Sequence, residues 1–404
     1  MNKRLFNMQY FHMPKCFTHD LNRVEKRSNR LPKSVLKRLS AYGLAVLLCL
    51  VCLTACGQGA GKNEAEKSPH KLTFFAMDTV MSFTAYGDEE LFTAEPEGSS
   101  VLDEAKDLVI GLDGMLSVTD ESSLIYKVNH SCGTAVNIPD DIAAFLTSAL
   151  EICGKTDGAL DLTVYPVVNT WGFTTRNYRV PSAREINDLL TYVDYRKVII
   201  KENSIVVENS KTGTPDQTPG TDCTMIDLGA VAKGYAADVT ASLLKDRGVS
   251  GAVISLGGNI RTVGSKPDGS RWNVAIASPD NSGYIGTLKT GETSVVTSGG
   301  YERYFEENGH HYCHIIDPST GYPVENGILS VTVIAESGLL CDGLSTALFV
   351  MGTEAAEDFW RSGTYDFDFI ILTDQDGIYI TEGVSSDFTV DSQYEGETVH
   401  ILHP

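Results

Sequence analysis

The chain has 404 residues, of which 42% are hydrophobic, so it is long enough to bury a large core. Its formal net charge at pH 7 is -21, and a surface of that sign argues against nucleic acid as a partner. The first 55 residues carry ten Lys and Arg and only two acidic residues, which leaves 22 basic and 51 acidic residues, a charge of -29, for the rest.

The N-terminus is typical of an exported lipoprotein. Its basic lead runs into an apolar stretch, Ala41 to Ala55, that ends in small residues directly before Cys56. About 15 apolar residues are short for a membrane span, which needs about 20, and fit the apolar core of a signal peptide. We therefore predict a lipoprotein signal peptide with a long basic lead over residues 1–55 and lipidation of Cys56. The protein would be extracytoplasmic and lipid-anchored to the cell membrane; the alternative is an uncleaved anchor or a structural cysteine.

Residues 56–70 are rich in Gly, Lys, Glu and Ser, a composition typical of a flexible tether. The body that follows contains five cysteines and no Cys-x-x-Cys pair, and an odd number leaves at least one thiol unpaired. No spacing of Cys and His predicts a zinc site. The five cysteines are Cys132, Cys153, Cys223, Cys313 and Cys341.

The first half of the body should mix helices, strands and loops. Apolar residues recur at helical spacing from Ser100 to Leu116, and Pro139 and Asp140 open a second helix that should end near Cys153. The Gly, Pro and aromatic residues of 158–173 predict an irregular segment, either a pocket wall or ordinary loop packing. We also expect a strand over 71–86, a polar connection over 117–129, a capped helix over 182–193 and a hairpin over 197–208.

A sharper pattern begins at Asp227. A strand that ends there should turn through Gly229 into a helix running to about Lys245. Backbone N–H groups at a helix N-terminus bind anions, and Lys233 in the first turn adds positive charge beside a phosphate. The spacing of a Walker A loop is missing, so the segment allows a nucleotide site but does not by itself predict one. Further strands are expected over 251–256, 272–276 and 330–335, a helix over 339–351 and a hairpin over 365–382.

The stretch from Val296 to Gly352 concentrates protonatable side chains. Three of the nine histidines of the chain fall within five residues there, next to an Asp-Pro turn. Farther along, Asp342 and Thr346 lie one turn apart on the same face of the expected helix. This density exceeds what a structural loop needs and indicates an enzyme site.

Seven motifs, taken in order, resemble the flavin transferase (ApbE) family, whose members are FAD:protein FMN transferases. The resemblance covers about 72–373 and implies that residues 71–404 form a flavin transferase catalytic domain. The motifs are AMDT (76–79), GALDLTVYP to WGF (158–173), DLGAVAKGYAAD (227–238), SLGGN (255–259), TSGGYERYF (297–305), HIIDPSTGYP (314–323) and CDGLSTALFVMG (341–352).

The resemblance implies roles for particular residues. The magnesium site of the family corresponds to Asp342 and Thr346, with a backbone carbonyl from Ala230, and Mg²⁺ prefers such oxygen ligands. The catalytic histidine corresponds to His314, which makes His310 and His311 bystanders. Positions that match the FAD pocket are Met77, Asp161, Thr163, Asp227, Lys233, Gly257, Gly258 and Asn259.

The implied reaction transfers FMN from FAD to a Thr or Ser hydroxyl of a partner, an acceptor flavoprotein subunit or an FMN-binding domain, and releases AMP. Mg²⁺ would neutralise the pyrophosphate and His314 would deprotonate the acceptor hydroxyl. Two alternatives stay open. One is a Mg²⁺-dependent FAD pyrophosphatase that uses water in place of the acceptor, and the other is a flavin-binding or solute-binding lipoprotein without catalysis.

The sequence departs from the family pattern at two places. Relatives often carry an aromatic residue after the first helix that stacks on the flavin, whereas residues 116–119 offer none, so Tyr301 or Trp171 would have to serve. Gly300 stands where an acidic or amide residue is common. Because the motifs come from distant parts of the chain, we expect an α/β (α+β) fold with two packed halves, mixed β-sheets flanked by helices, and an FAD cleft at their junction.

Overall fold

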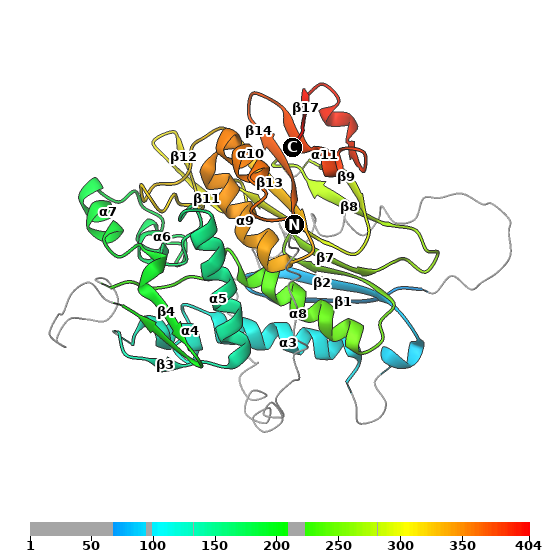
Figure 1. Ribbon diagram of the computed structural model, residues 1–404, viewed down its shortest axis with the longest axis horizontal. Helices are drawn as coiled ribbons and strands as arrows, with labels where there is room; N and C mark the ends of the chain where they lie inside the picture. Colours follow the sequence, from blue (N-terminus) through cyan, green and yellow to red (C-terminus); the bar gives the residue numbers. More distant parts are fainter. Residues whose placement is uncertain (1–67, 94–98, 132, 209–222, 281) are drawn as a thin grey trace, which may run out of the picture. The chain divides into compact units, whose positions relative to one another are not determined.

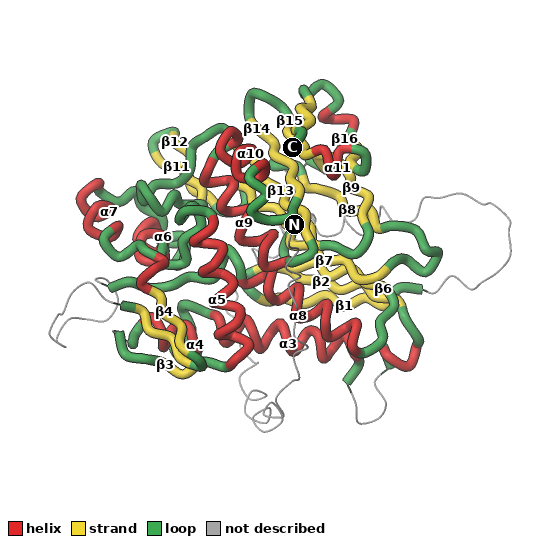
Figure 2. The backbone as a smooth tube through the Cα atoms, viewed as in Figure 1, coloured by secondary structure: helices red, strands yellow, loops and turns green. Residues whose placement is uncertain are grey.

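The computed structural model describes residues 68–93, 99–131, 133–208, 223–280 and 282–404. The expected signal peptide, Cys56, most of the tether and Cys132 lie outside these residues. Glu66–Pro404 group into one compact unit (Figures 1 and 2). In the described part, no helix is long and apolar enough to cross a membrane.

A nine-stranded sheet forms the centre of the fold. Every neighbouring pair of strands is antiparallel except the last, β15 and β17, which is parallel. The order is β1 (His70–Ala76), β2 (Thr79–Tyr86), β6 (Gly251–Leu256), β7 (Asn259–Gly264), β10 (Ser294–Gly299), β13 (Ile328–Ala335), β14 (Asp368–Thr373), β15 (Ile378–Thr381) and β17 (Val399–Leu402).

The central strands are covered on both faces. In β13, Val331 and Val333 enter the main core with the helices, whereas Ile334 enters a second core beneath a small sheet. Successive side chains of a strand point to opposite faces, so this alternation places one strand between two hydrophobic layers. The small sheet consists of β16 (Phe388–Val390), β9 (Tyr284–Thr290) and β8 (Trp272–Ala277).

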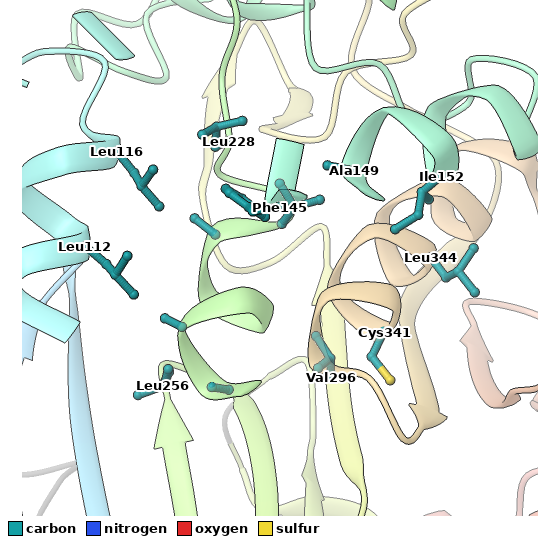
Figure 3. Packing of buried hydrophobic residues seen from close by; sticks show 14 of the residues in the cluster. Leu112, Leu116, Phe145, Ala149, Ile152, Leu228, Leu256, Val296, Cys341 and Leu344 are labelled. Atoms are coloured by element: carbon teal, nitrogen blue, oxygen red, sulfur yellow. The ribbon is translucent and has the colours of Figure 1, made fainter. Parts of the chain in front are cut away.

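Helices pack against the other face of the large sheet and bury the main core. Leu112, Phe145 and Leu344, which come from different helices, belong to this core and are among the buried side chains drawn in Figure 3. Ser100 caps the first of them by accepting a hydrogen bond from the backbone N–H of Asp103. The helices are α3 (Val101–Leu116), α5 (Asp140–Lys155), α8 (Ala232–Asp246), α9 (Gly338–Met351) and α10 (Thr353–Arg361).

The other α-helices and small sheets lie towards the side of the molecule that carries α6 and α7 (Figure 1), apart from α11 (Glu382–Ser385) near the C-terminus. They include two small sheets and three short helices. The sheets are β3 (Val136–Asn137), β5 (Ser204–Val207) and β4 (Val198–Lys201), and the hairpin β11 (Tyr304–Glu307) and β12 (His310–Cys313); the helices are α4 (Leu124–Asn129), α6 (Tyr165–Trp171) and α7 (Ala183–Leu190).

The α/β class with mixed sheets is confirmed, but four predictions of individual elements were wrong. The expected strand over 71–86 is a hairpin, because Met77 and Asp78 adopt φ of 46° and 59° and form a two-residue turn. The connection over 117–129 contains α4, and the irregular segment over 158–173 contains α6. No strand ends at Asp227; only Met225 forms an isolated bridge, with Val164.

The helices α8 and α9 cross at a contact between two glycines. A Cβ atom built on Gly234 would lie 2.2 Å from the carbonyl oxygen of Gly338, and one on Gly338 would lie 2.7 Å from the carbonyl oxygen of Gly234. Only residues without a side chain let the two backbones approach this closely. The glycines therefore set the spacing of the helix pair.

Gly234→Ala should separate the two helices and lower the free energy of unfolding by about 1–3 kcal/mol, the usual cost of overpacking a core. Gly111→Ala in α3 is the matched control, because a Cβ there meets no atom within 4 Å. That change should stabilise the protein by about 0.5–1 kcal/mol, the intrinsic helix preference of Ala over Gly. Urea unfolding of both variants measures the difference, and equal stability of the two would contradict this account of the crossing.

Candidate active site

Two carboxylates hold α8 and α9 together by capping each other's helix. Asp342 of α9 accepts a hydrogen bond from the backbone N–H of Gly234 in the first turn of α8, at 2.8 Å. In return, Asp238 of α8 accepts hydrogen bonds from the backbone N–H groups of Gly338 and Leu339 at the start of α9, at 2.8 and 3.0 Å. Each carboxylate satisfies N–H groups that a helix leaves without a partner. Asp342 is thereby fixed at the N-terminus of α8.

Oxygen atoms gather around the carboxyl group of Asp342, which is only 3% exposed. Thr346 follows one turn later, and its hydroxyl lies 3.4 Å from Oγ of Ser298 in β10. The carbonyl of Ala230 accepts no hydrogen bond from the described residues, because Gly234, its regular helical donor, bonds to Asp342 instead. One carboxylate, one hydroxyl and one open carbonyl are a donor set that suits a hard cation such as Mg²⁺.

A cation here would need further oxygen ligands from a substrate or water. Within the described residues, no cluster of three or more His, Cys, Asp or Glu side chains could hold a metal ion. Mg²⁺ characteristically keeps few protein ligands and completes its shell with phosphate and water oxygens. The set around Asp342 therefore fits Mg²⁺ together with a phosphate-bearing ligand better than it fits a structural metal.

Two cations, Lys233 and Arg303, dominate the electrostatics beside this set. Among the described residues neither forms an ion pair within 4.0 Å, although both act on the titratable groups around them. Burial raises the pKa of Asp227, and Arg303 and Lys233 oppose that rise. Glu302 is exposed to solvent, yet the surrounding protein raises its pKa, with Lys233 and Arg303 acting in the opposite direction and Asp342 adding to the rise. Unpaired positive charge of this kind attracts anions such as phosphate.

His314 follows directly after β12, and its ring is held from one side. Its Nδ1 lies 3.2 Å from the carbonyl oxygen of Arg303, which also accepts the backbone N–H of His314 at 2.9 Å. A proton on Nδ1 satisfies that contact and leaves Nε2 as the free acceptor. Burial of the ring, then the charges of Arg303 and Lys233, lower the pKa of His314 to about 3. The imidazole is thus neutral at pH 7 and able to accept a proton.

The two other histidines of the expected cluster lie apart from this group. His310 and His311 are exposed in β12, where the ring of His311 stacks on Tyr304 at 4.3 Å between centroids. Both stand nearer the tip of the hairpin than His314, and they lie in a strand, not in the loop that the sequence indicated.

Glycine turns and a buried amide border the site on the sheet side. Gly257 and Gly258, at φ of 62° and 100°, join β6 to β7, and a Cβ on Gly257 would meet the side chain of Thr79 at 2.4 Å. Gly258 faces Glu302, whose Oε1 lies 4.0 Å from where its Cβ would be. Asn259 is 2% exposed, and its Nδ2 has no hydrogen-bond partner among the residues that the structure describes. A buried donor without a partner is costly unless a ligand or water satisfies it.

Other predicted pocket residues are used inside the chain. Asp161 accepts from the N–H and hydroxyl of Thr163, at 2.7 and 2.6 Å, and from the N–H of Tyr195 at 3.0 Å. Asp227 accepts from Gly229 N–H at 2.6 Å. Met77 occupies the turn of the β1–β2 hairpin. These contacts shape loops, and a role of the residues in binding FAD stays a prediction.

The aromatic candidates for flavin stacking differ from each other. Trp171 is fully buried and donates its indole N–H to the carbonyl of Gly321, so both faces of its ring are covered and the suggestion that it stacks on a flavin was wrong. Tyr301 is half-buried against Gly299, where a Cβ would meet its ring at 2.4 Å. Burial raises the pKa of Tyr301, so its hydroxyl stays protonated. Tyr301 remains the candidate.

Sequence reasoning missed Arg303, Glu302 and Ser298 as members of the site. All three lie in the motif at 297–305, but their place in the site depends on Lys233 in α8 and Asp342 in α9, which are distant in the sequence. The adjacency of Arg303 to β11, opposite His314, was the one signal that could have indicated it.

Comparison with known proteins bears on the whole body. The model of the ApbE family matches residues 77–371. The chain is 31% identical over 326 residues to the FAD:protein FMN transferase of Treponema pallidum (strain Nichols), which covers 78% of this chain and 86% of the relative. It is 32% identical over 266 residues to the FAD:protein FMN transferase of Vibrio cholerae serotype O1, covering 65% and 76%.

Solved structures agree with the sequence comparison. The flavin transferase ApbE from Vibrio cholerae superposes with a TM-score of 0.66 at 26% identity and covers 82% of this chain and 100% of that chain. The ApbE protein of Thermotoga maritima gives a TM-score of 0.65 at 29% identity, covering 81% and 98%.

The lowered pKa of His314 gives a titration that can be measured. Its imidazole resonances should stay constant from neutral pH to about pH 4, whereas an ordinary histidine titrates near about 6.5. Arg303→Gln, which removes one of the charges, should raise the pKa of His314. NMR of the chain, with His314→Gln for assignment, tests this, and a midpoint near the ordinary value in the unchanged chain would contradict it.

The lowered pKa of His314 also predicts how the stability of the fold depends on pH. The pKa of His314 is lower in the folded chain than in the unfolded chain, so below about pH 6.5 proton uptake favours the unfolded state. His314→Gln should therefore lose less stability than the unchanged chain as the pH falls from about 6.5.

Proposed function

The chain belongs to the ApbE family, and on that premise we propose that it is a FAD:protein FMN transferase. It would transfer FMN from FAD to a Thr or Ser hydroxyl of a partner flavoprotein and release AMP. The observation that carries the proposal is the position of a buried carboxylate, Asp342, at the N-terminus of α8, next to the free charge of Lys233. A helix N-terminus with an added cation suits a diphosphate, and the carboxylate suits the metal that accompanies one.

Asp342, Thr346 and the carbonyl of Ala230 would hold Mg²⁺ in this proposal. The support is the open donor set, since the Ala230 carbonyl accepts no hydrogen bond from the described chain and Asp342 has one donor, Gly234. When bound, Mg²⁺ neutralises pyrophosphate charge and makes the phosphorus easier to attack.

Side chains of the protein would bind the substrate and move the proton. Lys233 and Arg303 would bind and orient the pyrophosphate. His314, neutral at pH 7 and oriented by the carbonyl of Arg303, would take the proton of the acceptor hydroxyl at Nε2. The acceptor oxygen forms a bond to the phosphorus on the FMN side, the bond from that phosphorus to the AMP phosphate breaks, and AMP leaves. A placed general base is worth about 10² to 10⁴ in rate.

The glycine turn would let FAD approach the backbone closely. Gly257 and Gly258 carry no side chain to obstruct it, and the unpartnered Nδ2 of Asn259 can donate to an acceptor atom of the ligand. Tyr301 would supply the aromatic contact to the flavin. Asp161, Thr163 and Asp227 would act by holding the loops that surround the ligand, because Oδ1 of Asp161, the hydroxyl of Thr163 and Oδ1 of Asp227 already have partners within the chain.

Membrane attachment is a separate proposal. Lipidation at Cys56 after removal of residues 1–55 would anchor the protein outside the cytoplasm, where 56–70 would serve as the tether. The support is the apolar stretch that ends in small residues before Cys56. The mass of the mature N-terminal peptide reports the modification, and an unmodified or uncleaved N-terminus would remove the proposal.

The transferase activity is tested by intact-mass spectrometry of a candidate flavoprotein subunit after incubation with this chain, FAD and Mg²⁺. We expect a mass gain of one FMN residue on the subunit and one AMP released per transfer. Incubation with FAD and Mg²⁺ alone is the control, since rapid AMP release without an acceptor would favour the pyrophosphatase. Tight FAD binding without turnover under any acceptor would favour a non-catalytic protein.

Asp342→Asn separates the metal role from the structural one. The amide oxygen can still accept the hydrogen bond from Gly234, but the negative charge is gone. Transfer of FMN should fall by at least about 10²-fold and should no longer respond to Mg²⁺.

Asp238→Asn is the matched control for that variant. It removes the other capping carboxylate of the helix pair, which lies outside the proposed metal set, so it should lower stability while the response to Mg²⁺ persists. Transfer rates measured over a Mg²⁺ series decide between the two. Mg²⁺-dependent transfer at the unchanged rate in Asp342→Asn would show that the metal binds elsewhere.

A further inference from the structure

We propose that Ser298 and Ser345 are positioning residues of the cation site, because their hydroxyl groups fix the direction in which the hydroxyl of Thr346 points. Three hydroxyl groups form a chain of hydrogen bonds that starts at Thr346 and ends at the backbone carbonyl of Asp342. The inference rests on the proposed transferase function, in which Asp342 and Thr346 hold Mg²⁺. It adds two residues that would act on the cation through Thr346.

The packing of α9 against β10 brings these hydroxyl groups together. Val296 of β10 and Cys341 of α9 belong to the same core (Figure 3), and Sγ of Cys341 lies 3.8 Å from the carbonyl oxygen of Ser294. Ser298 follows Val296 by two residues and therefore points to the same face of the sheet, towards α9. Its Oγ lies 2.8 Å from Oγ of Ser345, one turn of α9 after Cys341. The strand and the helix are thus joined by apolar contacts and by this pair of hydroxyl groups.

The direction of each hydrogen bond in the chain follows from the last acceptor. A carbonyl oxygen carries no proton, so Ser345 donates its single hydroxyl proton to the carbonyl of Asp342, at 2.9 Å. Ser298 must then donate to Ser345, and Thr346 must donate to Ser298 across 3.4 Å. No other assignment of the three protons satisfies all three contacts. The protons of Thr346, Ser298 and Ser345 therefore all point along the chain towards that carbonyl.

This direction prepares the hydroxyl of Thr346 to bind a cation. A hydroxyl group is both donor and acceptor, and it can bind a cation only through a lone pair of its oxygen. Because the proton of Thr346 is directed to Ser298, the lone pairs are left for the set formed with Asp342 and the carbonyl of Ala230. Groups that orient a metal ligand from behind commonly raise the affinity for the metal.

Burial makes the chain hard to replace with water. Ser345 is 0% exposed, and Ser298 and Thr346 are half-buried. Loss of the Ser298 hydroxyl would leave the oxygen of Ser345 without its donor and the proton of Thr346 without its acceptor, and a buried polar group is costly without a partner. The hydroxyl of Thr346 could then turn its proton towards the cation, which would weaken binding.

A second pair of hydroxyl groups on β10 provides a matched control. Thr297 points to the opposite face of the sheet, and its Oγ1 lies 2.8 Å from Oγ1 of Thr332 in β13. This pair joins two strands and is not part of the chain to Thr346. Thr297→Val therefore removes a hydrogen-bonded hydroxyl from the same strand and leaves the cation set intact, whereas Ser298→Ala breaks the chain.

Binding of Mn²⁺ to the chain with FAD, in the absence of an acceptor, tests the proposal apart from activity. Mn²⁺ takes the same oxygen ligands as Mg²⁺, and the EPR signal of the free ion reports its binding. Ser298→Ala and Ser345→Ala should each weaken binding at least about tenfold. The double variant should bind within about twofold of the weaker single variant, because both substitutions break one chain. Fully additive losses would overturn the proposal.

The control variant separates positioning from general loosening of β10. Thr297→Val should bind Mn²⁺ within about twofold of the unchanged chain, and urea unfolding should show that both it and Ser298→Ala are folded. Equal Mn²⁺ affinity in Ser298→Ala and Thr297→Val, whether both are reduced or both retained, would overturn the role of Ser298.

The dependence of FMN transfer on Mg²⁺ provides a second readout. In Ser298→Ala the Mg²⁺ concentration for half-maximal rate should rise by the factor found for Mn²⁺, while the rate at saturating Mg²⁺ stays within about threefold. A lower saturating rate with an unchanged Mg²⁺ requirement would contradict the proposal.

Asp342→Asn distinguishes failure of this inference from failure of the proposed function. If Asp342→Asn loses Mn²⁺ binding and Ser298→Ala does not, the cation site stands and the positioning role is overturned. If Asp342→Asn binds Mn²⁺ as tightly as the unchanged chain, the cation lies elsewhere, and both the metal site of the proposed function and this inference fail.

Discussion

The exchange of carboxylates between α8 and α9 is the interaction on which the site depends. Asp342 of α9 accepts a hydrogen bond at the N-terminus of α8, and Asp238 of α8 accepts one at the N-terminus of α9. The contact between two glycines lets the helices approach closely enough for both. Burial of such charges is costly unless hydrogen bonds compensate it. Burial raises the pKa of Asp238, and its backbone donors together with Arg261, 3.9 Å away, oppose the rise. The exchange is thus structural, and it also places the carboxylate of Asp342 where the proposed metal site would use it.

The contact between α8 and α9 positions the groups that the proposed chemistry would use. The backbone N–H of Gly234 bonds to Asp342, which leaves the carbonyl of Ala230 without a helical donor. Lys233 lies in the same first turn of α8. The carbonyl of Arg303, directly before β11, lies within 3.2 Å of Nδ1 of His314. Burial of the imidazole, and then the positive charge of Arg303 and Lys233, keep His314 neutral, so the cations that would bind a pyrophosphate also help to keep the proposed base unprotonated. Phosphoryl transfer relies mainly on positioning and charge neutralisation, which this arrangement would provide in the proposed reaction.

The sequence predicted long, periodic elements and the residues of strong motifs. Apolar residues at helical spacing and capping residues predicted helices α3, α5 and α9. His314 and Asp342 stand in motifs whose chemistry is specific. The β1–β2 turn was missed because Met77 and Asp78 adopt positive φ without a glycine. α6 was missed because its stability comes from burial of Trp171, which is a property of the packing. The sequence alone could not identify Arg303 as a site residue, because its role depends on Lys233, which is distant in the sequence.

A crystal structure of the chain with FAD and Mg²⁺, in the absence of acceptor, tests the central claim most directly. The account predicts a metal ion about 2.0–2.1 Å from oxygen atoms of Asp342, Thr346 and Ala230 and from the FAD pyrophosphate. It also predicts that Nε2 of His314 faces the FMN-side phosphorus across the space for one hydroxyl group. A metal bound away from Asp342, or a pyrophosphate distant from the N-terminus of α8, would contradict it.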